Sequence, residues 1–286
     1  MGGNMIYLEK FVFPSNDKEG SFFKNIMRTC YQSFYPFQIL ADFEPLELDF
    51  ESITILYGGN GSGKTTALNV IAEKLSLKRE AVYNRSNFYE DYLKLCHYRI
   101  EQDIPKNSEI ITSDDVFDYA LNLRCLNNGI DQKREEVFDE YLDKKYAKFQ
   151  LKSLEDYEEL KQVNQAKSKT QSKYVKENLM GNVKTHSNGE NAYQYFTERI
   201  KDNALFLLDE PENSLSPKMQ FQLKKFIEDA VRYFGCQIIM ATHSPFLLSI
   251  EGAKVYDFDN QPITITPWQE LENIKLYRDF FNTIEE

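Results

Sequence analysis

Several things that the sequence lacks limit what the chain can be. No apolar run approaches the roughly 20 residues that a membrane-spanning helix needs, so we expect no membrane span. The four cysteines are scattered and form no C-x-x-C pair, which argues against a metal centre or a disulfide framework. The first residues have neither the basic nor the apolar region of a signal peptide. We therefore expect a cytoplasmic protein with reduced thiols.

The chain also has fewer basic than acidic residues. The 286 residues include 34 Lys and Arg against 45 Asp and Glu, a net charge of −11. A protein whose whole surface binds nucleic acid is usually basic, so the charge balance argues against indiscriminate coating of DNA. A local basic patch stays compatible with it. Hydrophobic residues make up 42% of the chain, which is ordinary for a globular protein and enough for one large domain or two lobes.

What the chain does contain is a glycine-rich stretch that fits G-x-x-x-x-G-K-[ST] at every fixed position. A β-branched apolar run over residues 52–57 predicts a buried strand before it, and residues 66–75 predict a helix after it. In this context the loop binds a triphosphate through its backbone N–H groups and the positive end of the helix. The predicted nucleotide-binding residues here are Gly58, Gly59, Asn60, Gly61, Ser62, Gly63, Lys64, Thr65 and Thr66.

Two residues of this loop have an expected chemical role. Lys64 should reach the β- and γ-phosphates, and the Thr65 hydroxyl should ligate a magnesium ion. We therefore predict ATP and Mg²⁺ as cofactors. The alternative, a glycine-rich turn that matches by chance, becomes weaker with the motifs that follow.

A second motif is a short apolar run that ends in two carboxylates. Residues 205–208 predict a buried strand, and Asp209 and Glu210 stand at its C-terminal end, the edge at which open α/β sheets bind ligands. We predict that Asp209 holds Mg²⁺ through water and that Glu210 is the general base that polarises the attacking water. The alternative is an ordinary strand end with two solvated acids.

A third motif is a strand over residues 237–242 that leads into Thr242-His243-Ser244-Pro245. A histidine at a strand end is often only a capping or core residue. Because this one follows a strand that ends in Asp-Glu, we predict that His243 senses the γ-phosphate.

The chain between these motifs changes in composition. From about residue 130 to 180 it is strongly charged, and apolar side chains recur at helical spacing, which predicts a helical lobe inserted over residues 116–186. Five of its lysines have no acidic residue between them. They either contact nucleic acid or a partner, or lie in a mobile, solvated loop, and the interleaved Ser, Thr and Gln favour the loop. These lysines are Lys161, Lys167, Lys169, Lys173 and Lys176.

Asp209-Glu210-Pro211-Glu212 and the Thr242–Pro245 stretch together resemble the ABC-type ATPases. Ser187-Asn188-Gly189-Glu190 resembles a diverged form of that family's L-S-G-G-Q signature, and is more similar to RecF-like and other stand-alone ATPases than to transporters. The C-terminal residues also resemble those of a compact group of bacterial AAA/ABC-type ATPases. The resemblance runs from residue 5 to 286 and implies one α/β P-loop NTPase domain: an ABC-ATPase-like head with an N-terminal β subdomain and an inserted helical lobe.

The resemblance also implies roles for further residues. Ser187 and Gly189 would bind the γ-phosphate on a second copy of the chain, and Ser214–Pro217 would be the D-loop. Asp114 or Asp115 would take the place of the family's Q-loop glutamine and hold Mg²⁺ or water; Gln102 is a weaker candidate.

The function implied is that of a soluble ATPase. Two copies would dimerise head to tail with ATP between them, and hydrolysis would release them. The work done would be conformational, on a protein or nucleic-acid partner, for example in DNA repair or defence. The alternatives are the ATPase subunit of a membrane transporter and a nucleotide-sensing interaction module with little turnover.

Overall fold

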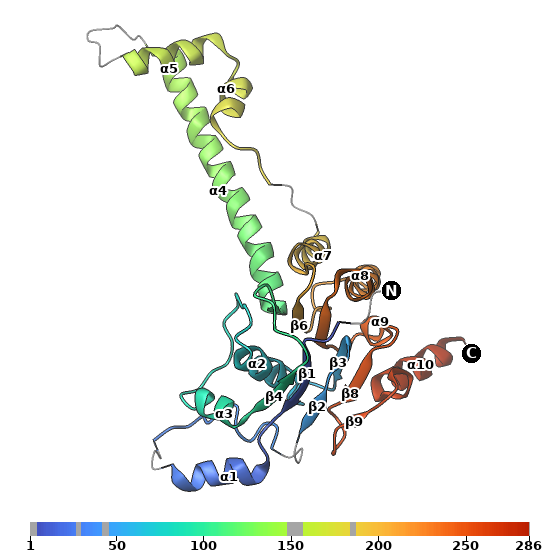
Figure 1. Ribbon diagram of the computed structural model, residues 1–286. Coiled ribbons are helices and arrows are strands. Elements are labelled where there is room, and N and C mark those ends of the chain that lie inside the picture. Colours follow the sequence, from blue (N-terminus) through green and yellow to red (C-terminus); the bar gives the residue numbers. More distant parts are fainter. Residues whose placement is uncertain (1–4, 27–29, 42–45, 148–156, 184–186, 286) are drawn as a thin grey trace. The chain divides into compact units, whose positions relative to one another are not determined.

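The computed structural model describes residues 5–26, 30–41, 46–147, 157–183 and 187–285 (Figure 1). It divides into two compact units. The head unit combines Met1–Phe117 with Asn188–Glu286, and the helical unit is Asp118–Ser187. We predicted a helical lobe over residues 116–186 within one domain, and that domain assignment stays a prediction. No helix in the described part of the chain is long and apolar enough to cross a membrane.

The centre of the head unit is a six-stranded sheet with the order β5-β6-β7-β3-β8-β9. The first five strands in this order run parallel, and β9 runs antiparallel to β8. Because parallel strands share a direction, their carboxyl ends meet at one edge. The strands are β3 (Ile53–Tyr57), β5 (Glu109–Thr112), β6 (Leu205–Asp209), β7 (Gln237–Ala241), β8 (Lys254–Asp257) and β9 (Thr264–Ile265).

A second, antiparallel sheet has the order β2-β1-β4, with β1 (Leu8–Val12), β2 (Glu47–Asp49) and β4 (His97–Ile100). The fully buried Gln237 joins the two sheets. Its Oε1 accepts hydrogen bonds from the N–H groups of Tyr7 and Leu8 at 2.8 and 2.9 Å, and its Nε2 donates to the Leu8 carbonyl. With a further bond from Nε2 to the Glu51 carbonyl at 3.1 Å, the buried amide has four hydrogen bonds and fixes one arrangement of the sheets, because any other would leave its polar atoms unpaired.

Helix α2 (Lys64–Lys74) packs on β5, β6 and β7 and is buried around most of its surface. Leu205 and Leu207 of β6 share a core cluster with α2 and with β1 and β2. Leu208, between them and the carboxylates, is also fully buried, so both faces of the strand are covered. That is why β6 appears in the sequence as a continuous apolar run. The helix carries the P-loop at its first turn, so this packing sets the position of the site.

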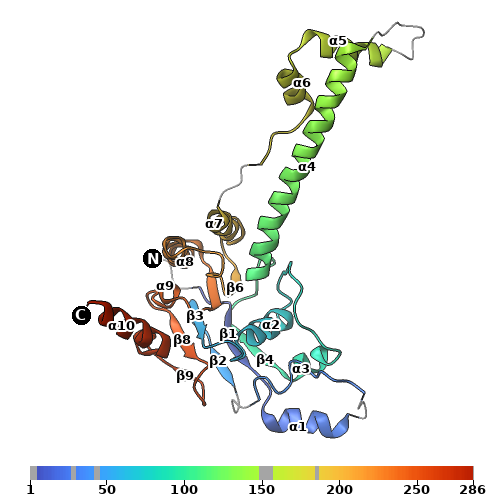
Figure 2. The ribbon, with the colours of Figure 1, turned by 180° about the vertical axis from the view of Figure 1, so that it is seen from behind.

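The remaining elements complete the head unit. Helix α8 begins with Pro217 at its first position after Ser216, and ends at Gly235, whose φ of 64° forms the left-handed cap. Helix α10 lies at the edge of the head beyond β8 and β9 in both views (Figures 1 and 2). The helices are α1 (Asn16–Asn25), α3 (Tyr89–Leu95), α7 (Asn188–Arg199), α8 (Pro217–Phe234), α9 (Pro245–Leu248), η2 (Trp268–Glu270) and α10 (Glu272–Glu285).

The helical unit is built on α4 (Ser113–Tyr146), which begins in the head, with α5 (Tyr157–Ser168) and α6 (Gln171–Asn178). The lysine-rich stretch, for which we favoured a mobile loop, forms α5 and α6 instead. That preference was wrong because it weighed the polar residues and overlooked the apolar ones between them. Five side chains form a small core that holds these helices on α4, namely Val137, Tyr141, Ala166, Tyr174 and Val175.

Candidate nucleotide-binding and hydrolysis site

The P-loop joins the carboxyl end of β3 to α2, and its glycines are required by its shape. Gly63 caps α2 with a φ of 95°, and a Cβ added there would lie 2.7 Å from the Leu40 side chain. A Cβ on Gly58 would lie 2.7 Å from Ser62 Oγ. Conformation and space therefore both demand glycine at Gly63.

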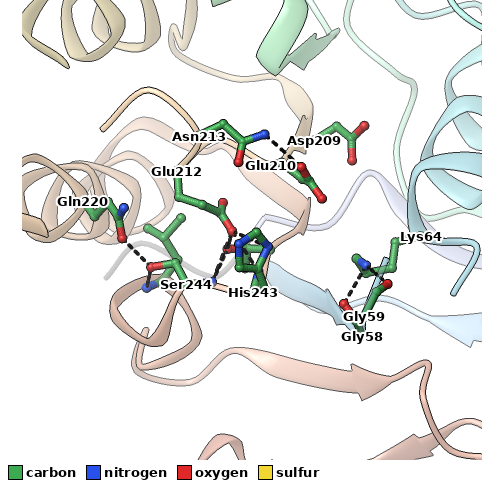
Figure 3. A network of polar contacts seen from close by, with 12 residues as sticks. Gly58, Gly59, Lys64, Asp209, Glu210, Glu212, Asn213, Gln220, His243 and Ser244 are labelled. Carbon is green, nitrogen blue, oxygen red and sulfur yellow. Dashed lines mark hydrogen bonds and ion pairs between the residues drawn. The ribbon is translucent and has the colours of Figure 1, made fainter. Parts of the chain in front are cut away.

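The Lys64 side chain is folded over the P-loop (Figure 3). Its Nζ donates hydrogen bonds to the carbonyls of Gly58 and Gly59 at 2.6 and 2.8 Å, and to Ser62 Oγ at 3.3 Å. Burial lowers the pKa of this ammonium, while the nearby carboxylates, Glu210 first among them, act in the opposite direction. The lysine is thus held beside the loop with its three donors on oxygen atoms, the kind of partner that a phosphate also offers.

Thr65 and Asp209 lie side by side. The Thr65 Oγ1 donates a hydrogen bond of 3.0 Å to Asp209 Oδ1. Burial raises the pKa of the Asp209 carboxyl to about 6, and the Thr65 hydrogen bond opposes that rise. A hydroxyl and a carboxylate oxygen are hard ligands of the kind that Mg²⁺ binds, so these residues fit that ion. In the described ranges, no group of three or more His, Cys, Asp or Glu could hold a metal by itself. A magnesium ion here would depend on phosphate oxygens as well.

Glu210 follows β6 in an uncommon backbone conformation. Its φ of 47° lies in the left-handed region, which few non-glycine residues adopt. Its N–H donates to the Ala241 carbonyl at 2.9 Å, and the Asn213 side-chain amide donates to its Oε2 at 2.8 Å (Figure 3). The carboxylate is half-buried and oriented by one amide, an arrangement suited to a general base.

Glu212, two residues further on, has another task. It is buried, and its Oε1 accepts hydrogen bonds from Thr242 Oγ1 at 2.6 Å and from the His243 and Ser244 N–H groups at 2.8 and 3.1 Å. The same oxygen lies 3.3 Å from His243 Nδ1. An imidazole whose Nδ1 faces a carboxylate presents Nε2 on the other side of the ring. We quoted Glu212 as part of a motif, but this role was missed.

The structure brings the predicted catalytic residues to one edge of the sheet. Lys64 follows β3, Asp209 and Glu210 end β6, and His243 follows β7, which lies between these two strands. Figure 3 shows them around the same opening. The register explains this closeness, because Asp209 is paired with Ala241 and Leu56 is paired with the same alanine.

Thr66, also predicted to bind nucleotide, accepts a 3.1 Å hydrogen bond from the Tyr35 hydroxyl. Tyr35 lies outside every motif that we used. Of the other loop residues, Asn60 is exposed and Gly61 has open space around it. The loop therefore presents an accessible surface on one side and is supported by Tyr35 behind Thr66.

The choice between Asp114 and Asp115 depends on their hydrogen bonds. Asp115 is buried, and its Oδ1 accepts from the Ala81 N–H at 2.7 Å. Its Oδ2 accepts from the Thr112 N–H and hydroxyl at 2.7 and 2.8 Å, which forms a capping box at the start of α4. Asp115 therefore has a structural role. Asp114 is exposed on the same turn and remains our predicted metal ligand. Gln102 follows β4 in the other sheet.

The signature-like residues stand at the start of α7. Ser187 is exposed directly before the helix, and Gly189 is in its first turn. A Cβ on Gly189 would lie 3.4 Å from the Ser214 carbonyl, so this turn packs against the predicted D-loop of its own chain. Their contact with a γ-phosphate on a second copy stays a prediction.

One further contact was invisible in the sequence. Both carboxylate oxygens of Asp259 accept hydrogen bonds from the Gly59 N–H, at 2.8 and 3.0 Å. Asp259 lies in the turn after β8, some 200 residues from the P-loop. No spacing or motif connects the two positions.

The sequence profile of the ABC transporter family matches residues 45–213, more than half of the chain. The chain belongs to this family. It is an ABC-type P-loop ATPase, which confirms the predicted fold class, ATP binding and enzyme activity. A second profile, the AAA ATPase domain, matches residues 189–248. No curated protein matches the chain.

Three solved structures are similar in shape at low identity. An inward-facing ABC transporter of metal-chelate type is 16% identical with a TM-score of 0.43, covering 96% of this chain and 90% of that one. The cassette MJ0796, as a post-hydrolysis dimer bound to ADP and Pi, is 13% identical with a TM-score of 0.38, covering 78% and 90%. Another dimeric structure of MJ0796, titled a bacterial ABC transporter cassette, is 14% identical with a TM-score of 0.35, covering 76% and 87%. The family assignment rests on the sequence match alone.

Proposed function

We propose that ATP closes two copies of this chain head to tail and that hydrolysis reopens them, in the cytoplasm. The observation that supports this is the convergence of Lys64, Asp209, Glu210 and His243 at one sheet edge. Those groups form half of an ATP sandwich. The other half, Ser187 and Gly189, stands at the start of α7, and Ser187 is exposed. A site completed by a second copy would make hydrolysis depend on closure.

The residues divide the work of phosphoryl transfer between them. Lys64 and the loop N–H groups hold the β- and γ-phosphates, while Thr65, Asp209 and Asp114 would hold Mg²⁺, which supplies charge neutralisation when bound. Glu210 accepts the proton of the attacking water. His243 presents Nε2 to the γ-phosphate and is fixed from behind by Glu212 Oε1.

The ATP cycle would do conformational work on a protein or nucleic-acid partner. The net charge of −11 favours a protein partner over DNA alone. A role in DNA repair or defence is the finer form of this proposal. Another candidate function is a nucleotide sensor with little turnover. The oriented Glu210 disfavours it, and ATP binding without phosphate release would support it.

A transporter ATPase subunit is the second candidate, and the match to the ABC transporter profile favours it. The signature-like S-N-G-E at residues 187–190 departs from the family's usual L-S-G-G-Q, which disfavours it. Co-purification of the full chain with a membrane-spanning protein would decide in favour of this candidate.

The first test uses the Glu210→Gln variant, which should bind ATP without hydrolysing it. Light scattering on a sizing column would measure its mass with and without Mg-ATP. An ATP-dependent increase in mass supports the sandwich. A mass that stays that of a monomer, with ATP binding confirmed by calorimetry, contradicts closure of two copies.

A mixing experiment tests the trans arrangement directly. Lys64→Ala damages the P-loop and Ser187→Arg damages the signature, so each variant alone should be inactive. In a head-to-tail pair of the two, one site has both defects and the other has none. Mixing should therefore restore roughly a quarter of wild-type turnover, given random pairing and sites that act independently. A mixture as inactive as its components would contradict the arrangement.

A further inference from the structure

Helix α10 carries a row of large apolar side chains that the described residues leave largely exposed. The helix is anchored at its start, where Leu271 and Ile274 are buried and the Asn273 N–H donates to the Tyr57 hydroxyl at 3.2 Å. Beyond that point Leu276, Phe280 and Ile284 are 59%, 59% and 64% exposed. Their four-residue spacing places them in one line along about 12 Å of helix.

This row lies on the wrong side of the helix for core packing. Successive residues are about 100° apart around the helix axis. Phe280, the centre of the row, therefore lies about 120° around the axis from the buried Ile274. A surface helix normally has polar residues there. Tyr277 and Phe281, 46% and 59% exposed, widen the apolar surface toward a pocket of about 620 Å³ that His243 and Glu212 also line. Five such residues on one helix form a contiguous patch, unlike the single exposed apolar residues common on protein surfaces.

The size of the patch suits a protein interface. A fully buried aromatic side chain covers 150–250 Å², so at these exposures the five side chains present on the order of 500 Å². Two copies that covered each other's patch would bury roughly 1,000 Å² from these residues alone. Neighbouring polar residues would bring the total near the roughly 1,200 Å² at which specific, stable interfaces begin.

We propose that α10 is a self-association helix: the α10 of a second copy packs antiparallel on this patch and forms a dimer without nucleotide. The row is symmetric about Phe280, with Leu276 and Ile284 four residues to either side. A two-fold axis at Phe280 therefore places Leu276 opposite the partner's Ile284 at both ends, as a self-complementary interface requires.

The charges on α10 disfavour a membrane as the occupant. Helices that lie on membranes are rich in Lys and Arg on their polar face. Here the helix has two basic residues, Lys275 and Arg278, against three acidic ones, Glu272, Asp279 and Glu285, and the chain as a whole carries −11. Anionic lipid would be repelled by that net charge. Because α10 carries both acidic and basic side chains, the α10 of a second copy can approach it without facing a run of charges of one sign.

This interface is separate from the ATP sandwich, which would use the P-loop and the signature. It would hold two heads together between rounds of hydrolysis and raise their effective concentration for closure. Its central row, Leu276, Phe280 and Ile284, is not part of the pocket lining that includes His243, so the interface does not require the sandwich to exist.

The test measures the mass of the full chain in EDTA without nucleotide, by light scattering and sedimentation velocity across a wide range of concentrations. We expect a dimer in rapid exchange with monomer. Phe280→Glu should raise the dimer dissociation constant at least roughly 30-fold, because it buries unpaired charges at the two-fold axis. Asn282→Glu adds the same charge on the polar side of the same helix and should change it less than roughly 3-fold.

Several results would overturn the proposal. One is a wild-type chain that stays monomeric at every concentration; another is an equal effect of Phe280→Glu and Asn282→Glu. Flotation of monomeric protein with vesicles of mixed neutral and anionic phospholipid, lost on Phe280→Glu, would replace the dimer with a membrane contact. Leu276→Lys repeats the test if Phe280→Glu fails to fold, as judged by thermal unfolding. In Glu210→Gln/Phe280→Glu, a dimer that appears only with Mg-ATP would show that the sandwich stands independently.

Discussion

The P-loop side and the switch side of this site are built in different ways. On the P-loop side, Lys64 bonds to Gly58 and Gly59, five or six residues away, so the contacts are local. On the switch side, Glu212 reaches Thr242 and His243, about thirty residues away, directly after the neighbouring strand β7. The Lys64 contacts are therefore encoded in one stretch of sequence, and those of Glu212 exist only after β6 and β7 have paired.

The two glutamates of the switch side show what this difference teaches. Glu210 and Glu212 are separated by one proline, yet one is half-buried beside Asn213 and the other is buried under four polar atoms of residues 242–244. These two carboxylates thus have different surroundings, from which we propose chemistry for Glu210 and support for Glu212. Substitutions that separate activity from stability should distinguish them.

The largest effect should come from Glu210→Gln. Loss of a general base lowers kcat by about 10²–10⁴-fold, while the amide keeps the volume and hydrogen-bonding capacity of the side chain. ATP affinity and the unfolding temperature should stay close to wild type. Phosphate release at saturating Mg-ATP measures kcat. Calorimetry measures the ATP affinity and the unfolding temperature. A fall of less than tenfold would remove Glu210 from the role of base.

Glu212→Ala should act in the opposite way, mainly on stability. It leaves the Thr242 hydroxyl and the His243 and Ser244 N–H groups without their acceptor in a buried place. We expect the free energy of unfolding in urea to fall by about 4 kcal/mol, because each unpaired buried donor costs 1–3 kcal/mol. Glu212→Gln keeps an acceptor and should lose under about 1.5 kcal/mol. Equal stability of the alanine and glutamine variants would contradict the supporting role.

Asp209→Asn should stabilise the nucleotide-free protein at neutral pH. The pKa of Asp209 is raised by burial to about 6, so the folded state binds a proton that the unfolded state releases near pH 4. Ionising this buried carboxyl lowers the free energy of unfolding. The loss is absent below pH 4, grows between pH 4 and 6, and is complete above pH 6. A pKa raised by about two units corresponds to a loss of up to about 3 kcal/mol.

The measurement is urea unfolding in EDTA from pH 5 to 7.5. The variant should be the more stable protein at pH 7.5, and its advantage should shrink as the pH falls. Thr65→Val serves as a control, because it removes the hydroxyl that opposes the shift and should enlarge the pH dependence. A difference between Asp209→Asn and wild type that does not change with pH would show that Asp209 keeps an ordinary pKa in the fold.

The comparison also marks what the sequence could predict. The P-loop, Asp209, Glu210 and His243 could be predicted as site residues because each ends an apolar strand or follows a fixed spacing, and the structure places them at one sheet edge. Strand β4 was missed because it has only four residues and all of them are exposed, so no buried face marks it. The capping role of Asp115 and the support from Glu212 depend on partners that only the folded chain brings close.

The smallest effect belongs to the long-range contact between Asp259 and the P-loop. Asp259→Ala removes the acceptor of the Gly59 N–H, an exposed hydrogen bond worth about 1 kcal/mol. We expect KM for ATP to rise about fivefold while kcat stays within about twofold, since the loop loses a support and no catalytic group. Asn260→Ala is the matched control, because Asn260 bonds to Asp257 and Thr264 in the same turn and not to the P-loop. If both variants raise KM equally, the turn as a whole matters and the bond from Asp259 does not. If only Asp259→Ala does so, even the P-loop side depends on a residue some 200 positions away.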